Sequence, residues 1–383
     1  MKKYYILLIS MTLCLCYSCQ NNKDIAKINF TIDSCTISHP DIKQITSKIN
    51  IAMIDIKKWN DTTFLFLIPS NMNSTISLYT YYWDNGFNLL SKYELSDSIS
   101  NFFLKNQYNS ITFINKDSLI AGGNNNFAII DLKKNEISPS YRPNENEYLQ
   151  ATQNPLQWNS KHKLLLSEYL NYSNPTSELG IVQTEIIACI DFYNNKLYKI
   201  PIKMINEEQI KLDPNYVFHF STFDDKIIGK HSIKNEFLVY NFNDNSVKTI
   251  ENDALANFNK KFTNKEKERL EKLQKQLGLY DFRLNEFANN YIQKAIVCDQ
   301  TNGNIIIAYL DPVPQDGKDD KKPPISYRAK TFLIFDKDFN LLGEIKTDVD
   351  NFTPSMFFSI DNNIFLIEIC FNKLNIKRIS YES

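Results

Sequence analysis

Apolar and polar residues alternate along this chain in a recurring unit of two strands joined by a polar turn. The strands are filled with β-branched and aromatic residues, and the turns contain Asn, Asp or Gly, which accept the dihedral angles of tight turns. The pattern predicts six β-hairpins, at residues 76–95, 127–137, 186–200, 237–250, 331–346 and 364–380.

Two further short strands precede most of these hairpins, for example 216–222 with 226–230 and 295–299 with 304–310. Four strands per unit, repeated about every fifty to sixty residues, is the spacing of a β-propeller. We therefore predict an all-β fold over residues 27–383, a β-propeller of six four-stranded blades. The strand at 27–32 is expected to pair into the last blade and cover its edge. A propeller of seven blades and a large β-sandwich are the alternatives.

Three long segments, 170–182, 252–290 and 311–328, interrupt the regular pattern. If the strands of a blade are lettered a to d from the axis outwards, the a–b and c–d turns lie on one face of the disc. The b–c loops and d–a links lie on the other face. Assigning the hairpins as c–d turns places all three long segments on the opposite face. Because long loops on rigid scaffolds often carry function, we expect the contact surface there.

The segment 252–290 contains the one clear helix of the sequence. Thr263 and Glu266 form a capping box, leucines recur on one stripe, and Gly278 is a helix stop. The helix either packs its leucines onto the disc or serves as a lid or a docking element for a partner.

The N-terminus predicts export and anchoring. Residues 1–18 have a basic start, an apolar run and a small final residue, as in a secretory signal peptide. The run is shorter than the ~20 apolar residues of a membrane span. Ser18 and Cys19 resemble a bacterial lipobox, although Cys16 replaces the usual Leu, Val or Ile. We expect lipidation of Cys19 and a polar tether over residues 19–26, with ordinary secretion as the alternative.

Composition and charge limit the partners. Hydrophobic residues make up 43% of the chain and charged residues 23%, which permits a large core. The net charge of −1 argues against nucleic acid. No spacing of Cys and His suits a metal, so neither a metal site nor a cofactor is predicted. Four cysteines remain in the mature chain, and spacing leaves their disulfide status open: Cys35, Cys189, Cys298 and Cys370.

Four features of the sequence point to the same kind of protein. They are the lipobox, a length near 380, a composition rich in Asn, Lys and Tyr, and the degenerate four-strand repeat. Together they resemble the six-bladed β-propeller lipoproteins of Bacteroidetes, many of which belong to families of unknown function. The resemblance spans the whole chain and rests on pattern, since the familiar propeller signatures are absent. It implies an outer-membrane lipoprotein of the cell envelope. The periplasmic and surface-exposed sides both stay open.

Catalytic motifs are absent from the sequence, and four side chains are candidates for ligand binding. Trp158 either stacks on a sugar ring or belongs to the core. His219, on a predicted inner strand, binds a ligand or metal or is a satisfied structural histidine. Tyr280 and Phe282 either line a pocket or anchor the insertion.

These observations favour a non-catalytic binding module that engages a protein, peptide or glycan through the insertion-bearing face. The alternative is an enzyme, a glycan lyase or hydrolase that acts in the central channel. A structural accessory of an envelope complex is the third possibility. The sequence does not identify the ligand or the oligomeric state.

Overall fold

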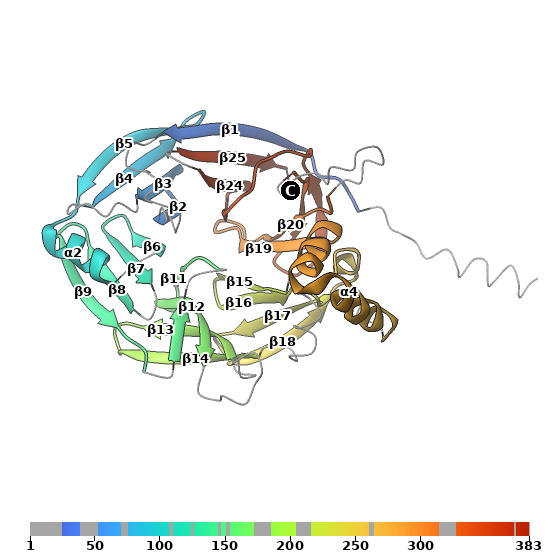
Figure 1. The fold of residues 1–383 in the computed structure, drawn as a ribbon. Coiled ribbons are helices and arrows are strands. Elements are labelled where there is room, and N and C mark those ends of the chain that lie inside the picture. Colours follow the sequence, from blue (N-terminus) through green and yellow to red (C-terminus); the bar gives the residue numbers. More distant parts are fainter. Residues whose placement is uncertain are drawn as a thin grey trace, which may run out of the picture.

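Six antiparallel sheets stand around a central axis in the computed structural model (Figure 1). The structure describes residues 25–38, 53–69, 76–106, 110–123, 126–144, 147–150, 154–171, 185–203, 216–259, 264–313, 327–370 and 373–382. The predicted six-bladed β-propeller is confirmed, because the sheets surround an axis and are not layered face to face.

The first three blades follow the chain from the axis outwards, and the inner strand of blade 3 is split in two. Blade 1 contains β2 (Met53–Trp59), β3 (Thr62–Ile68), β4 (Ser77–Trp83) and β5 (Phe87–Glu94). Blade 2 contains β6 (Ser110–Asn115), β7 (Ser118–Gly123), β8 (Asn126–Asp131) and β9 (Glu136–Tyr141). Blade 3 contains β10 (Glu147–Gln150), β11 (Gln157–Asn159), β12 (Leu164–Asn171), β13 (Glu185–Asp191) and β14 (Lys196–Lys203).

The last three blades use the same order, and blade 6 takes its outermost strand from the N-terminal part of the chain. Blade 4 contains β15 (Phe218–Phe223), β16 (Lys226–His231), β17 (Glu236–Asn241) and β18 (Ser246–Glu251). Blade 5 contains β19 (Ile292–Cys298), β20 (Ile305–Leu310), β21 (Lys330–Phe335) and β22 (Leu341–Lys346). Blade 6 contains β23 (Met356–Ile360), β24 (Asn363–Cys370), β25 (Lys373–Tyr381) and β1 (Phe30–Ser38).

Pairing of β1 with β25 closes the ring. The two strands are antiparallel, with Phe30 opposite Tyr381 and Ser38 opposite Lys373. The predicted closure by an N-terminal strand is therefore confirmed, although the strand begins at Phe30. Closure covers an edge that would otherwise present unpaired backbone groups.

This closure corrects one assignment made from the sequence. The hairpin at 364–380 was expected to be a c–d pair, but β1 supplies strand d of blade 6. β24 and β25 are consequently strands b and c. Their connection leaves on the face opposite the turns of the other five hairpins, which are c–d pairs as predicted.

The strand order places the ends of the three long segments on one face. The β12–β13 and β20–β21 connections are b–c loops, and the β18–β19 connection is a d–a link. We call this the insertion face, and the opposite side, with the a–b and c–d turns, the turn face. Residues 172–184 and 314–326 lie outside the described residues, so only the β18–β19 insertion is described nearly throughout.

Asparagines shape the c–d turns. Asn85, Asn135, Asn195 and Asn245 have φ of 53°, 56°, 49° and 56° in four successive blades. Asn adopts this left-handed region at lower cost than most residues, because its short side chain bonds locally. These asparagines therefore have a local structural role in the turns.

The hydrophobic core lies between blades. Six large clusters of buried side chains each join two neighbouring sheets. Phe66 of blade 1 stacks on Phe113 of blade 2, with ring centroids 3.9 Å apart. Phe237 of blade 4 meets Phe335 of blade 5 edge to face, at 5.2 Å. Such ring pairs contribute about 0.5–1.5 kcal/mol each beyond the area that they bury.

Helices occur in the d–a links. In α4 (Asn264–Asn289), Gly278 has φ of 77° and separates two helical segments. The predicted stop is thus confirmed, while the second segment was not predicted, and Thr263 of the capping box lies outside the described residues. The 3-10 helix η1 (Asp253–Asn257) precedes α4, and α2 (Asp97–Asn106) was also not predicted. None of the described helices is long and apolar enough to cross a membrane.

Candidate functional site

The propeller axis holds a small cavity of about 60 Å³. Its lining comes from the inner strands β2, β11, β15, β19 and β23 and from residues beside them. Space of this size corresponds to about two water molecules, at roughly 30 Å³ each. This cavity, which inner strands of five blades line, is therefore narrow.

Asp55 is the only carboxylic acid among the described residues that line this axial cavity. Its Oδ2 accepts a hydrogen bond from the backbone N–H of Phe113 at 2.7 Å, and its Oδ1 accepts one from Ile56 at 2.9 Å. Burial raises the pKa of Asp55, while Lys57, 3.4 Å away, opposes the shift. The carboxylate thus ties blade 1 to blade 2. Glycosidases generally need a second carboxyl group facing the first, and the described lining supplies only this one.

The two candidate residues on inner strands, Trp158 and His219, have different environments in the structure. Trp158 lies on β11, borders the axial cavity and packs half-buried against the core between blades 2 and 3. His219 on β15 is buried, and its Nδ1 lies 3.2 Å from Oδ1 of Asn154. Burial, aided by the charge of Lys294, lowers the pKa of His219 to about 3. This histidine is therefore neutral at physiological pH and has a structural partner.

The aromatic candidates of the insertion lie in α4. Phe282 is fully buried and packs with Leu270 and Leu273 of the same insertion, so it joins the two segments of α4. The side chain of Tyr280 lies outside the described residues, as does Cys19.

A larger cavity of about 180 Å³ opens on the insertion face, between the helical insertion and blades 4 and 5. Asn257 and Asn289 are exposed at its rim, and Gln293 is buried. We call it the amide pocket, because five of its ten lining side chains are amides and none is charged. Its lining residues are Ser232, Ile233, Asn257, Phe258, Asn259, Asn289, Asn290, Tyr291, Gln293 and Pro312.

Asn259 fixes one wall of the amide pocket to blade 4. Its Nδ2 donates to the carbonyl oxygen of Lys234 at 2.7 Å and to Oδ1 of Asn235 at 2.6 Å. Its Oδ1 accepts a hydrogen bond from Nζ of Lys230 at 3.1 Å. The segment after η1 is thereby held against the β16–β17 connection.

Arg328 fixes the opposite wall. Its Nη1 donates to the carbonyl oxygen of Phe287 at 2.8 Å, and its Nη2 donates to that of Asn290 at 2.7 Å. Its Nε donates to the carbonyl oxygen of Asp311, just after β20. The last carbonyls of a helix have no partner within the helix, so this buried guanidinium caps α4 and joins it to blade 5.

Aromatic rings form the apolar part of the amide pocket. The ring of Phe258 lies 4.8 Å from that of Tyr291 and 4.9 Å from that of Tyr309, centroid to centroid. Phe258 is buried, whereas Tyr291 is half-buried. The pocket thus offers a partly accessible ring beside its amides.

Gln293 contributes an unpartnered acceptor. Its side chain is 2% exposed, and its Nε2 donates to the carbonyl oxygen of Lys230 at 3.3 Å. Its Oε1 has no hydrogen-bond partner within the part of the chain that the structure describes. A buried acceptor without a partner costs about 1–3 kcal/mol, and native proteins contain few of them.

Lys230 lies behind the pocket lining and is fully buried. Its Nζ donates to the carbonyl oxygen of His231 at 3.0 Å and to that of Ser232 at 3.5 Å, besides Asn259. Burial lowers the pKa of Lys230 to about 7, and the charge of Glu236 only partly opposes this shift. Its ammonium group therefore donates to uncharged oxygens of the protein itself.

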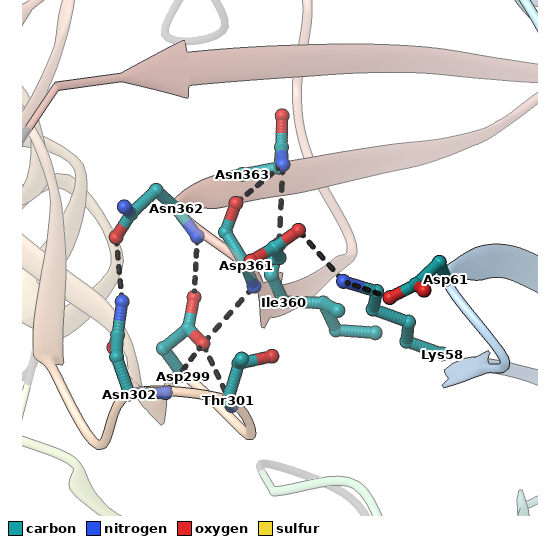
Figure 2. A network of polar contacts seen from close by, with 9 residues as sticks. All are labelled: Lys58, Asp61, Asp299, Thr301, Asn302, Ile360, Asp361, Asn362 and Asn363. Atoms are coloured by element: carbon teal, nitrogen blue, oxygen red, sulfur yellow. Dashed lines mark hydrogen bonds and ion pairs between the residues drawn. The ribbon is translucent and has the colours of Figure 1, made fainter.

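The turn face is occupied by contacts between blades (Figure 2). Asp299, buried at the β19–β20 turn, accepts hydrogen bonds from backbone N–H groups of its own turn. It also accepts bonds from the N–H groups of Asp361 and Asn362, both at 3.0 Å, and from the hydroxyl of Ser359 at 2.9 Å. Lys58 of blade 1 reaches Asp361 at 2.8 Å. These contacts join three blades around the axis.

Metal and thiol chemistry have little geometric support in the described residues. Among them, no group of three His, Cys, Asp or Glu side chains is placed to hold a metal ion. All four cysteines of the described chain are free thiols. Burial raises the pKa values of Cys189 and Cys298, which disfavours the reactive thiolate form.

Sequence reasoning did not identify the amide pocket. Its residues come from four separate stretches of the chain, and none of them forms a motif. The one local signal was the presence of asparagines at both ends of the 252–290 insertion, Asn257 and Asn259 before α4 and Asn289 and Asn290 after it.

Comparison with known proteins supports the fold. No protein-family model matches the sequence, and no curated protein is similar to it. A member of the DUF4221 family from Bacteroides vulgatus matches with a TM-score of 0.61 and 11% identity, over 93% of this chain and 99% of that one. A protein of Bacteroides fragilis that is described as exported matches with a TM-score of 0.47 and 9% identity, over 92% of this chain and 96% of that one. The first likeness shows a shared fold and agrees with the resemblance to Bacteroidetes propellers of unknown function.

Proposed function

We propose that this chain is a lipid-anchored protein of the cell envelope and a non-catalytic binding module that holds its ligand on the insertion face. The ligand is a protein, peptide or glycan outside the cytoplasm. The observation that carries the proposal is the amide pocket, the larger of the two cavities described, which is built by the β18–β19 insertion against blades 4 and 5.

The contrast between the faces supports this choice. On the turn face, Asp299 and Asp361 meet protein donors. On the insertion face, the side chain of Asn257 is exposed at the rim of the amide pocket. An exposed amide at the rim of a concave site is accessible to a ligand.

The entry point of the chain supports presentation of the insertion face to partners. Ile25 precedes Lys27, which pairs with Glu344 of β22, and Phe30, which pairs with Tyr381 at the end of β25 that leads to the turn face. Six residue steps separate Cys19 from Ile25, which limits their separation to about 20 Å. A lipid on Cys19 would thus hold the turn face near the membrane and direct the insertion face away from it.

Binding to isolated cell envelopes tests the proposed surface. We would compare the soluble chain from residue 20 onwards with Asn257→Trp on the insertion face and Asn243→Trp on the turn face, both exposed positions. We expect Asn257→Trp to weaken binding about tenfold or more and Asn243→Trp to leave it unchanged. Loss of binding in the turn-face variant alone would contradict the proposal.

A separate experiment tests the anchor. Metabolic labelling with a palmitate analogue should mark the full-length protein and should not mark Cys19→Ser, which should move to the soluble fraction. Equal labelling of both proteins, or equal release of both, would show that Cys19 does not carry the lipid.

A further inference from the structure

We infer that Lys294 binds a carboxylate group of the ligand on the insertion face, close to the propeller axis. This inference rests on the proposed function and names a chemical group that the ligand carries. Three properties of Lys294 support it: its position in a bulge of an inner strand, its ammonium group without a partner, and the positive charge of its surroundings.

Lys294 lies on β19, the inner strand of blade 5, beside the axis (Figure 1). The strand begins on the insertion face, where the β18–β19 insertion leads into it, and Lys294 is its third residue. Gln293 pairs with Tyr309 and Ala295 pairs with Ala308, so Lys294 is the extra residue of a β-bulge. Bulges change the direction of a side chain and are frequent next to functional sites. The fold thus places a cationic side chain at the axial part of the insertion face.

The ammonium group of Lys294 has no partner. The residue is half-buried, and it forms no hydrogen bond or ion pair within the described part of the chain. The two other lysines on inner strands, both on β2, have carboxylate partners. Nζ of Lys57 lies 3.4 Å from Asp55, and Nζ of Lys58 lies 2.8 Å from Asp361. Because charges that are withdrawn from water are usually paired, Lys294 is the inner-strand lysine that calls for an external anion.

The surroundings of Lys294 are basic or neutral. Burial and the charge of Arg328 lower the pKa of Lys294, and no carboxylate of the described chain opposes this shift. The charge of Lys294 in turn contributes to the lowered pKa of His219, which is buried and neutral at physiological pH. An opposite charge beside an ammonium group favours its charged form. A bound anion would therefore raise the pKa of Lys294.

The site offers one accessible positive charge. Nζ of Lys294 retains solvent-accessible area, whereas the unpartnered Oε1 of Gln293 is enclosed. The guanidinium of Arg328 already donates to three carbonyl oxygens of the protein. Phosphate groups are usually held by Arg or by several donors together. A single ammonium group instead matches the single charge of a carboxylate.

Nuclear magnetic resonance of the soluble chain from residue 20 onwards tests the inference. Reductive methylation with isotope-labelled formaldehyde gives each lysine a methyl signal, and Lys294→Arg identifies the signal of Lys294. We expect acetate and glucuronate to shift this signal saturably and to raise the pKa of Lys294. The uncharged methyl ester of glucuronate, and sodium chloride at equal ionic strength, should leave it unchanged. The signal of exposed Lys265 is the internal control.

Binding to isolated cell envelopes connects this site with the ligand. Lys294→Gln should weaken binding about tenfold or more, because one charge-assisted hydrogen bond is lost, and Lys294→Arg should retain most of the affinity. Lys265→Gln removes an exposed lysine of α4 and should bind like the wild-type chain.

Thermal unfolding distinguishes a binding role from a structural one. The melting temperature of Lys294→Gln should not fall below that of the wild-type chain, because Lys294 has no partner in the fold. If this variant nevertheless folds poorly, the carboxylate titration of the wild-type chain decides the question. Tighter binding of an oligogalacturonate than of an acidic peptide would assign the carboxylate to a glycan, and the reverse order would assign it to a peptide.

The outcomes separate this inference from the proposed function. A Lys294 signal that no carboxylate shifts, or that the methyl ester shifts equally, would overturn the inference, as would unchanged envelope binding by Lys294→Gln. If that occurs while Asn257→Trp still weakens envelope binding, the insertion-face function stands. If Lys294 responds to carboxylates and Lys294→Gln loses envelope binding while Asn257→Trp has no effect, the carboxylate site stands and the amide pocket is not the contact surface.

Discussion

Burial decides the role of His219, and the sequence alone could not show it. The alternation of apolar residues around it correctly predicts an inner strand. Its partner, Asn154, lies on another blade, 65 positions away in the chain. The sequence did not identify Gln293 for the same reason, because the missing partner of its side-chain oxygen depends on how the blades assemble. Residue-level chemistry was therefore predictable only where neighbours in sequence determine it, as in the Asn turns.

The lowered pKa of His219 makes stability depend on pH. In the unfolded chain the imidazole titrates near its ordinary pKa of 6.5, and in the fold near 3. Between these values the unfolded state binds more protons, so stability falls as the pH decreases. From pH 7 to pH 5 the free energy of unfolding should fall by about 2 kcal/mol through this residue.

Urea denaturation at both pH values checks this prediction. The variant His219→Gln lacks the titrating group and should lose about 2 kcal/mol less than the wild-type chain over the same interval. An identical loss in both proteins would mean that His219 is not held neutral by the fold.

At the scale of elements, the hairpins were predictable because alternation and turn residues are local signals. The missed elements lack such signals. α2 is short and packs Ile99 and Phe103 into the core between blades 1 and 2, while the second segment of α4 packs Phe282 against the first segment. The split inner strand of blade 3 is interrupted around Asn154, whose side chain bonds to β12 and β15 instead.

The hydrogen bonds of Asp299 join blade 5 to blade 6. We therefore expect its loss to lower the free energy of unfolding more than the loss of an aspartate that bonds only within its own turn. Asp299→Ala removes acceptors for donors of blades 5 and 6 and should lower the free energy of unfolding by about 3 kcal/mol or more. Asp336→Ala removes bonds only within the β21–β22 turn and should cost about 1 kcal/mol. Chemical denaturation of both variants measures the difference, and equal costs would contradict an inter-blade role.

Arg328 controls the attachment of the helical insertion. Arg328→Met leaves the carbonyls of Phe287 and Asn290 without this donor, so hydrogen exchange in the second half of α4 should become faster. Exchange in β24 and β25, which it does not contact, should stay the same. Arg328→Lys should give an intermediate rate, because an ammonium cannot reach all three carbonyls in the geometry of the planar guanidinium. Unchanged exchange in Arg328→Met would show that the insertion is held elsewhere.

At the scale of the whole molecule, the repeat predicts the ring and the shared face of the insertions. The misassigned hairpin at 364–380 shows the limit of this reasoning. Local patterns count strands correctly, but only the pairing of β1 with β25, across nearly the full chain, fixes which strand of blade 6 is outermost.

Closure by β1 predicts the behaviour of a truncated chain. Removal of residues 20–38 exposes the edge of β25, and size-exclusion chromatography should show aggregates. Addition of a peptide with the sequence of residues 25–38 should restore the monomer by strand complementation. A truncated chain that stays monomeric with an unchanged melting temperature would show that closure does not depend on this strand.

The central claim is that the insertion face, at the amide pocket, is the contact surface. Site-specific photo-crosslinking in living cells tests it most directly, with the reactive group at Asn257 on the pocket rim or at Asn243 on the turn face. The account predicts adducts from position 257 and none from position 243. Adducts from position 243 alone would contradict it.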